Sequence, residues 1–592
     1  MSASTDFPGV TTTRRQYTDE ELIYDYGNGT SAGQRTRSVA TAGGGKPVPL
    51  LGHHGRCGGP SRRSGRRRRQ SGRQLGTGGA RSHVAGGPPG AGGGPVTTTP
   101  TTTPTPTPTP TLRRVPIGTG ATGTRVESDS MGQVEVPAEH YWGAQTQRSL
   151  IHFSIGDDHM PEAVYHAYGY VKKAAAQLNA AGGRLDRRLA EAIVAAADEV
   201  IAGKLDAEFP LYVWQTGSGT QSNMNVNEVI GNRASQLLGG ELGSKHPVHP
   251  NDHVNMSQSS NDTFPTAMHL ATLFAIREHT LPRVHELADA IWAKAVEWVD
   301  VVKIGRTHLQ DATPLTVGQE WSGWAAQLRA GADRLERSLD GVCELAAGGT
   351  AVGTGINAPN GFGDAIAGKL AELTGLPLIT ARNKFAAQGS LDAMVAVSAG
   401  LRGVAVALLK IANDMRWLAS GPRAGLRELR LPANEPGSSI MPGKVNPTQQ
   451  EAMVMVCLQV IGEDSIVAGA GAQGNFELNA MRPIIINNVL HCARILGDAA
   501  DKLRRYSIEG TQLDRDKIEA YVDSSLMLVT ALSPHIGYDK ASAIAHKADN
   551  ENTTLRDAAL ALGVSASDFD QIINPKTMVG HPHRDLGIDN GA

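Results

Sequence analysis

Four polar segments interrupt the apolar patterns of this sequence, and they hold the residues that could do chemistry. The most distinctive segment, 434–447, sets two serines and Lys444 among three prolines and two glycines. This composition indicates a mobile loop, and Asn446 is placed to cap a helix whose first residue is Pro447. A lysine beside the positive end of a helix makes a strong anion site. An ordinary long surface loop would not need these side chains to converge before an apolar helix.

A second segment, 305–314, contains a histidine among polar neighbours. We expect His308 to lie on a turn, with Pro314 beginning the next helix. A lone histidine is more often structural than catalytic. Its polar neighbours and its ordinary pKa of about 6.5 nevertheless suit a role in proton transfer.

The two remaining polar segments, 217–225 and 249–262, each precede a helical pattern. The first has two glycines and six hydroxyl or amide side chains. Hydroxyls and free backbone N–H groups at a helix start can bind a carboxylate or a phosphate, although an ordinary capping loop has the same composition. In the second, His249, Asp252 and His253 suggest a metal site, but their spacing matches no known zinc pattern. We therefore expect no metal.

Several common catalytic motifs are missing from the sequence. It has no phosphate-binding P-loop, no dinucleotide fingerprint after a strand and no nucleophile-elbow motif. The remaining inventory is serines, threonines and amides with one lysine and one histidine. Such a set can hold a small dianion and move a proton, with no cofactor.

Long helical patterns must position these segments, and the fold class is therefore mainly α. Apolar residues recur at helical spacing in 161–181, 184–202 and 226–238, and the pattern in 317–344 is amphipathic. Three segments are apolar almost all round, which predicts helices buried on every side in a central bundle: 263–276, 391–412 and 447–470. From about Ser507 the more polar pattern predicts a small helical domain.

Residues 1–123 differ in composition from the rest of the chain. They contain 16 Lys and Arg against 5 Asp and Glu, a charge of +11, whereas the whole chain has a net charge of −2. Arg-rich and Gly-rich runs and a Thr-Pro repeat predict a disordered extension, because such a segment buries little apolar surface. Arg66–Arg69 could contact nucleic acid, but a solvated tail is the simpler interpretation, and we expect no nucleic-acid partner.

Cysteine usage and hydropathy bound the location. The four cysteines are scattered, with no paired spacing, which favours reduced thiols in a cytoplasmic protein. No uninterrupted apolar run reaches about 18 residues, so we expect no membrane span. We also expect no signal peptide, because the first residues lack an apolar stretch.

The segment Gly437–Asn446, with the sequence GSSIMPGKVN, resembles the signature of the fumarase/aspartase superfamily. The resemblance covers roughly residues 125–592 and includes all four polar segments. Within the superfamily the sequence is most similar to class II fumarases. These resemble it in having histidine at position 308, where aspartases usually have glutamine, and in the segments Ser218–Asn223 and Met578–Gly580.

This resemblance implies a three-domain subunit with a long-helix bundle. The implied domains are 124–260, 261–506 with the signature loop, and 507–592, while residues 1–123 have no counterpart in the family. The subunits would form a homotetramer with a 20-helix core, and each active site would take residues from three chains. That arrangement accounts for functional segments spread over more than 200 residues.

The resemblance also implies the reaction, which is the reversible anti hydration of fumarate to (S)-malate in the tricarboxylic acid cycle. It proceeds through an aci-carboxylate intermediate and needs neither metal nor cofactor. Ser438 would be the base, and His308, paired with Glu451, would handle water on the opposite face. The substrate-binding residues implied are Ser218, Gly219, Thr220, Ser259, Ser260, Asn261, Thr307, Ser439, Lys444, Val445 and Asn446. A second anion site would comprise His249, Pro250, Asn251 and Asp252.

Two alternatives remain open. The chain could be another lyase of the same superfamily, such as an aspartase or an argininosuccinate lyase. It could also be a relative that keeps the fold without activity, although Ser438, His308, Lys444 and Asn446 are all present.

Overall fold

The computed structural model describes residues 112–588, which are mainly helical. Most of the predicted N-terminal extension, residues 1–111, lies outside the described residues. Residues 112–123, which the sequence assigned to the extension, are instead attached to the body. The N–H of Arg113 donates to the Leu237 carbonyl at 2.9 Å, and the Gly118 N–H donates to the Tyr141 hydroxyl at 2.9 Å. The extension therefore ends before residue 123.

The N-terminal part combines one hairpin with a cluster of helices. Buried alanines and valines along α2 and α3 let the helices pack closely, and Asp186 caps α3 by accepting from two backbone N–H groups. The elements are β1 (Thr124–Asp129), β2 (Gly132–Pro137), α1 (Ala144–His152), α2 (Glu162–Ala181), α3 (Arg187–Ile201) and α4 (Thr220–Leu237). The strands β1 and β2 pair antiparallel.

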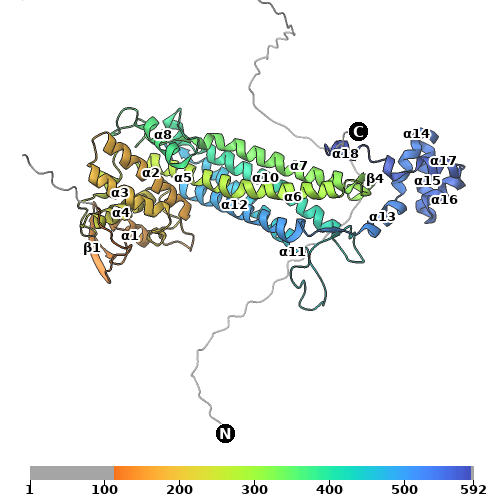
Figure 1. The fold of residues 1–592 in the computed structure, drawn as a ribbon, viewed down its shortest axis with the longest axis horizontal. Coiled ribbons are helices and arrows are strands. Elements are labelled where there is room, and N and C mark those ends of the chain that lie inside the picture. Colours follow the sequence, from red (N-terminus) through yellow and green to blue (C-terminus); the bar gives the residue numbers. More distant parts are fainter. Residues whose placement is uncertain (1–111, 589–592) are drawn as a thin grey trace, which may run out of the picture. The chain divides into compact units, whose positions relative to one another are not determined.

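Long helices form a bundle next to this part (Figure 1). Helix α5 (Ser260–Phe274) continues through a π-helical stretch (Ala275–Thr280) into α6 (Leu281–Glu297). The other bundle helices are α7 (Val317–Ser338), α10 (Asp392–Leu418), α11 (Thr448–Gly471) and α12 (Arg482–Leu503). Neighbouring pairs in contact include α6 with α7, α10 with α11, and α11 with α12.

The three segments predicted to be buried on every side differ in the structure. Almost all of α5 is buried, as predicted. Within one chain, helices α10 and α11 are buried on one side only, and their other sides expose apolar side chains such as Val406 (53 % exposed) on α10 and Met455 (65 %) on α11. Burial of these two helices on every side stays a prediction, because an all-apolar helix pattern does not say whether its own chain or another copy covers each face.

A β-hairpin carries the histidine segment, which corrects the helix expected to start at Pro314. Strands β3 (Val302–Thr307) and β4 (Gln310–Thr316) pair antiparallel, and Pro314 lies within β4. Helix α7 begins only at Val317, after Thr316 caps it in a capping box with Gln319. The two-residue turn consists of His308 and Leu309, both at positive φ.

The C-terminal residues form small helices with a core of their own. They are α13 (Arg515–Ser524), α14 (Ser533–Ile536), α15 (Tyr538–Glu551), α16 (Leu555–Ala561), α17 (Ala566–Ile572) and α18 (Pro582–Asp585). Buried residues between Leu528 and Phe569 make one hydrophobic cluster, separate from the main core. By contrast, apolar residues on both sides of position 260 share the main core. The three-domain division stays a prediction.

Short elements join the bundle helices. Helices α8 (Phe362–Thr374) and α9 (Lys384–Gly389) lie between α7 and α10 in the sequence. Two-residue strands pair locally: β5 (Glu344–Leu345) with β6 (Ile379–Thr380), β7 (Leu429–Arg430) with β10 (Gln512–Leu513), and β8 (Gly474–Asn475) with β9 (Leu478–Asn479). The segment 431–447 between β7 and α11 has no regular structure and contains the signature loop.

Candidate active site

A cluster of hydroxyl groups forms where α4 and α5 begin. The Thr220 Oγ1 lies 2.7 Å from the Ser218 Oγ and 2.9 Å from the Ser260 Oγ. Gly219, at φ 75°, is the residue before α4, and the N–H of Thr220 at the helix start donates to the Ser218 Oγ at 3.4 Å. The structure thus brings together two sequence-predicted segments that lie 40 residues apart.

The start of α5 is fixed by a capping box. The Ser259 hydroxyl accepts from the Asn261 N–H at 3.2 Å, and the Asp262 carboxylate accepts from the Ser259 N–H at 2.9 Å. The Asn261 side chain donates to the Ala351 carbonyl at 2.7 Å. Ser259 and Asn261 therefore lie beside the hydroxyl cluster, but the bonds they make in this structure are structural.

Two charged groups are buried beneath the cluster. The Lys172 ammonium donates to the side chains of Asn223, Asn255 and Gln258 at 2.7 to 3.0 Å. Burial lowers the pKa of Lys172 to about 7, although the nearby Asp262 opposes that shift. Burial also raises the pKa of Asp262, against three backbone N–H groups and Lys172, which favour its ionised form.

The signature loop closes on itself at its base. The Gly437 N–H donates to the Lys444 carbonyl at 2.9 Å, and the Asn446 amide donates to the Gly437 carbonyl at 2.6 Å. The Asn446 side chain is thus used in the loop and does not cap α11, which begins at Thr448 without a side-chain cap. The predicted capping role of Asn446 is wrong, because its amide satisfies a loop carbonyl instead.

Within this loop, the hydroxyl oxygen of Ser438 accepts two backbone hydrogen bonds. Its Oγ accepts from the N–H groups of Ile440 at 3.2 Å and Met441 at 2.9 Å. Two backbone donors aimed at one hydroxyl oxygen stabilise negative charge on it. Ser439 and Val445 lie on the same loop and are exposed.

Lys444 and Asn446 line a basic concavity of about 960 Å³ at the start of α11. The Lys444 ammonium donates to the Asn446 Oδ1 at 2.8 Å. The same cavity is lined by Arg416, Arg427 and Arg430, of which Arg427 and Arg430 pair with Asp514 at 3.0 and 2.8 Å. A concave surface with this charge attracts small dianions.

The third group of predicted residues is at the exposed tip of the β3–β4 hairpin. Thr307 and His308 are exposed there, while the hairpin base is held by Lys303, which contacts Glu320 at 2.7 Å and Glu428 at 2.9 Å. Glu451 lies in the first turn of α11 and is also exposed. Within residues 112–588 no hydrogen bond or ion pair joins His308 to Glu451.

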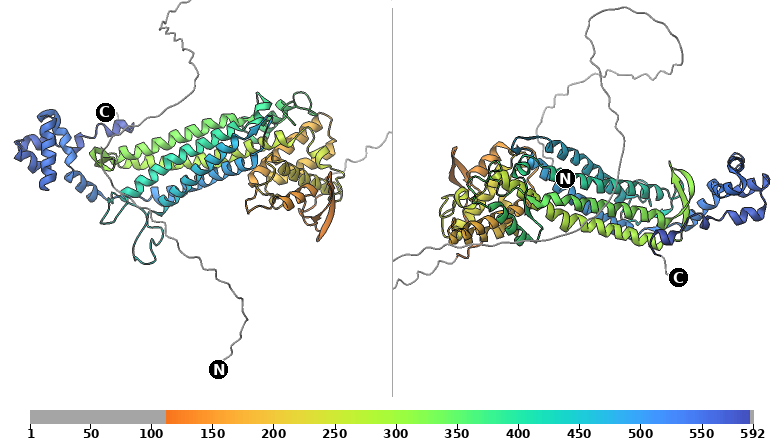
Figure 2. Two further views of the ribbon diagram at one scale, coloured as in Figure 1. Left: turned by 180° about the vertical axis from the view of Figure 1, so that it is seen from behind. Right: turned by 90° about the horizontal axis from the view of Figure 1, so that it is seen from above.

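The chain holds these groups apart. From Ser260 to Glu297 the backbone is helical throughout, a length of about 55 Å at roughly 1.5 Å per residue. Ser260 begins that length and the hairpin with His308 follows its end, so the views in Figure 2 show the hairpin at the far end of the bundle. One chain therefore cannot bring the hydroxyl cluster to His308.

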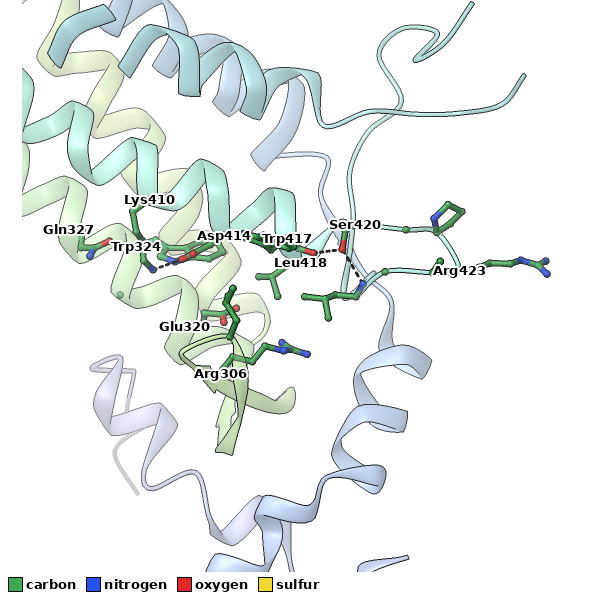
Figure 3. Close-up of a pocket in the computed structure, with 17 residues that line it drawn as sticks. Arg306, Glu320, Trp324, Gln327, Lys410, Asp414, Trp417, Leu418, Ser420 and Arg423 are labelled. Atoms are coloured by element: carbon green, nitrogen blue, oxygen red, sulfur yellow. Dashed lines mark hydrogen bonds and ion pairs between the residues drawn. The ribbon is translucent and has the colours of Figure 1, made fainter. Parts of the chain in front are cut away.

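The hairpin and the signature loop are at the same end of the bundle but line different cavities. A cavity of about 1360 Å³ is lined by Arg306 and Leu309, which flank the predicted pair, and by Trp324 and Trp417 (Figure 3). Two of its charged groups are paired with each other: Asp414 contacts Lys410 and also accepts from the Trp324 indole at 3.2 Å. None of the catalytic or substrate-binding residues predicted from the sequence lines this cavity.

The predicted second anion site, His249 to Asp252, is at the N-terminus of a short π-helical stretch (Pro250–Val254). The His249 Nδ1 accepts from the N–H groups of Asn251 and Asp252, each at 3.1 Å. The donors that an anion would need are thus directed at the histidine ring. An anion site here stays a prediction.

A metal site was not expected. Among the described residues, no group of three or more His, Cys, Asp or Glu side chains is arranged to hold a metal ion. The dependence of the reaction on metal is a matter for experiment.

Sequence reasoning missed the charges beneath the cluster, namely Lys172, Asp262 and Arg482. Arg482 is fully buried at the start of α12, and its guanidinium contacts the backbone of the cluster. An arginine directly before Pro483 and an otherwise apolar run is the one signal that could have drawn attention to it.

Comparison with known proteins identifies the family of this chain. A family model described as lyase matches residues 132–462, and one described as fumarase C C-terminus matches residues 528–580. The chain is 71% identical over 475 residues to the class II fumarate hydratase of Methanosarcina acetivorans, covering 80% of this chain and 98% of that protein. The chain belongs to the class II fumarase family.

Two more relatives support this assignment. The class II fumarate hydratase of Thermosynechococcus vestitus is 58% identical over 78% of this chain and 98% of its own length. Among solved structures, the class II fumarase of Schistosoma mansoni superposes with a TM-score of 0.76 at 45% identity, covering 77% of this chain and 99% of that one. The mainly helical fold is therefore that of the fumarases.

Proposed function

We propose that this chain is a fumarate hydratase, a hydro-lyase that interconverts fumarate and (S)-malate. The observation that carries the proposal is the Ser438 hydroxyl, which accepts two backbone N–H bonds within a loop that ends in Lys444 and Asn446. Its support is membership of the class II fumarase family. In cells the reaction would serve the tricarboxylic acid cycle.

The chemistry of malate dehydration explains why such a loop is needed. Removing a proton from C3 is difficult, because the adjacent ionised carboxylate acidifies that carbon only weakly. Ser438 would take this proton as an alkoxide stabilised by its two backbone donors and by Lys444. Lys444 and Asn446 would bind the carboxylate that becomes the doubly charged aci-acid.

The leaving hydroxide departs from C2 on the opposite face. His308, with Glu451 fixing its tautomer, would give the proton that turns this hydroxide into water. The proton taken from C3 remains on Ser438 until it is released to solvent. Thr220, Ser260 and Asn261 would hold the substrate carboxylates during both steps, helped by Ser218 and Thr307.

We further propose a homotetramer in which three chains build each site. The helical length between Ser260 and the hairpin separates the two halves of the chemistry within one chain. Helix α11 exposes Met455, Leu458 and Ile466, which together line one hollow on the surface of the bundle. Contiguous apolar surface of this kind is typical of a subunit interface, and additional copies would cover it while supplying the missing residues.

A cytoplasmic location is part of the same proposal. Cys343, Cys457 and Cys492 are buried free thiols, as expected in a reducing compartment. Helices α10 and α11 are long and apolar enough to cross a membrane by composition alone. A core helix of a bundle has the same composition, and both helices pack within this one.

A substrate panel tests the assignment against other lyases of the superfamily. Purified protein is incubated separately with (S)-malate, aspartate and argininosuccinate, and product is measured for each. Turnover of malate alone is expected. Faster turnover of aspartate or argininosuccinate would assign the chain to another lyase, and no turnover of any of the three would favour an inactive relative.

A further inference from the structure

A buried arginine connects the two helix starts that carry the hydroxyl cluster. Arg482 is 0 % exposed and is the first residue of α12. Its Nη1 donates to the carbonyls of Ser218 and Ser260, each at 3.5 Å, and its Nη2 donates to the Gln388 carbonyl at 3.0 Å. One planar guanidinium therefore touches both segments from which the cluster is built.

The backbone around Arg482 is equally close to the cluster. Its N–H donates to the Gly217 carbonyl at 3.0 Å. A Cβ added to Gly217 would come within 1.4 Å of the Ala480 carbonyl oxygen, so only glycine permits this approach. The segment before α12 and the loop before α4 are therefore packed directly against each other.

Arg482 also adds a positive charge behind the hydroxyls, in addition to the buried pair Lys172 and Asp262. The hydroxyls of Ser218, Thr220 and Ser260 are neutral donors, whereas a dicarboxylate has two negative charges. The Nε of Arg482 is buried and has no hydrogen-bond partner among the described residues. A buried cation behind neutral donors stabilises a bound anion more strongly than the same cation in water would.

We propose that Arg482 is a positioning residue for substrate binding. It fixes the positions of Ser218 and Ser260 relative to each other and places a positive charge behind them. The inference rests on the proposed function, because it assumes that a small dicarboxylate occupies the hydroxyl cluster. Arg482 itself stays behind the backbone and does not touch the substrate.

The test compares Arg482→Lys and Arg482→Gln with a matched control. Arg233→Lys is the control, because Arg233 is another buried arginine, on α4. It donates to Glu199 at 2.7 Å and to the Val115 carbonyl at 2.9 Å, away from the cluster. KM and kcat for (S)-malate are measured for each variant and the wild type, with assembly checked by size.

Arg482→Lys is expected to raise KM roughly 10-fold, because lysine cannot make the guanidinium hydrogen bonds to the carbonyls of Ser218 and Ser260. The same variant should change kcat by less than about threefold. Arg482→Gln, which also loses the charge, should raise KM further. The control should leave KM unchanged. Because KM does not depend on the amount of active enzyme, a small folded fraction is enough for the measurement.

A wild-type KM in the Arg482→Lys enzyme would overturn the inference and leave the proposed function intact. Any lower activity of that enzyme would then come only from a loss of folded protein. A wild-type protein that does not turn over malate would overturn the proposed function and this inference together. The wild-type arm of the experiment separates the two failures.

Discussion

At the scale of single residues, the proposed mechanism depends on making one serine oxygen basic. Ser438 accepts N–H bonds from Ile440 and Met441, and Lys444 lies on the same loop. These donors prepare the oxygen for negative charge before substrate arrives, which is how preorganised sites lower a barrier. Ser439, the next residue, has the same side chain as Ser438 but is exposed on the loop.

Replacing this oxygen is therefore predicted to stop turnover. Ser438→Ala should lower kcat by about 10³-fold, the usual contribution of a positioned general base, without loss of folding or assembly. Ser439→Ala is the matched control and should lower kcat by less than about tenfold. The ultraviolet absorbance of fumarate measures both. A Ser438→Ala enzyme with wild-type turnover would exclude this residue as the base.

Another single residue controls stability in acid. Burial lowers the pKa of His269 to about 4, and its Nδ1 donates to the Glu344 carbonyl at 3.1 Å. Between about pH 6.5 and pH 4 the unfolded chain binds a proton that the folded chain does not, so the free energy of unfolding falls as pH falls.

His269→Gln removes this titration. Between pH 6.5 and pH 4.5 the wild type should lose about 2 kcal/mol more unfolding free energy than the variant, since each pKa unit corresponds to about 1.4 kcal/mol and the unfolded histidine is already half protonated at pH 6.5. Urea unfolding at both pH values measures the difference. Equal acid sensitivity in the two proteins would show that His269 is not the group responsible.

The sequence could predict some residues of the candidate site but not others. Ser438, Lys444 and Thr220 belong to short polar segments, where composition itself marks a site. Lys172 and Arg482 stand in helical patterns more than 300 residues apart, and only the folded chain brings both to the same cluster. No local sequence pattern indicates that two residues so far apart in the chain lie close together in the fold.

At the scale of elements, the start of α4 depends on a backbone conformation that an L-residue rarely adopts. Gly219 has φ 75°, and a Cβ there would come within 2.1 Å of the Phe264 ring. Phe264 lies on α5, so the glycine allows the two helix starts to approach each other. The geometry of the hydroxyl cluster depends on that approach.

Gly219→Ala should therefore cost more than conformational strain alone. Gly183→Ala is the control, because Gly183 has φ 68° with open space around its Cβ position. The control should lose about 1 kcal/mol of unfolding free energy, and Gly219→Ala about 3 kcal/mol with a raised KM. Urea unfolding and malate kinetics measure these effects. Equal losses in the two variants, with unchanged KM, would contradict the packing argument.

Elements were predictable where periodicity was strong. The expected helix over 161–181 corresponds to α2, Glu162–Ala181. The β3–β4 hairpin was missed because its turn residues, His308 and Leu309, are at positive φ without the Asn-Gly or Asp-Gly pair that usually marks such turns. Tertiary contacts of the hairpin base, not turn chemistry, hold it in place.

At the scale of the whole molecule, the proposed active site requires residues from several copies of the chain. The hydroxyl cluster and the hairpin tip are at opposite ends of the bundle, and the apolar sides of α10 and α11 have no cover within the described part of the chain. The sequence predicted apolar helices correctly but not which faces stay open. That property depends on the packing of the entire bundle.

Mixing two inactive variants tests this sharing. If His308 and Ser438 of one site come from different chains, tetramers assembled from equal amounts of His308→Asn and Ser438→Ala should regain about a quarter of wild-type activity. A mixture of Ser438→Ala with Lys444→Ala is the control and should regain none, since both residues are on one loop. No recovery in the first mixture would contradict shared sites.

The most direct test of the central claim is a spectroscopic assay of the purified protein with EDTA present. (S)-malate is added, and the ultraviolet absorbance of the fumarate double bond is followed, with (R)-malate in a parallel sample. We predict a rise with (S)-malate only and no need for added metal. An assembled, folded protein that gives no rise, or that requires a metal ion, would contradict the account.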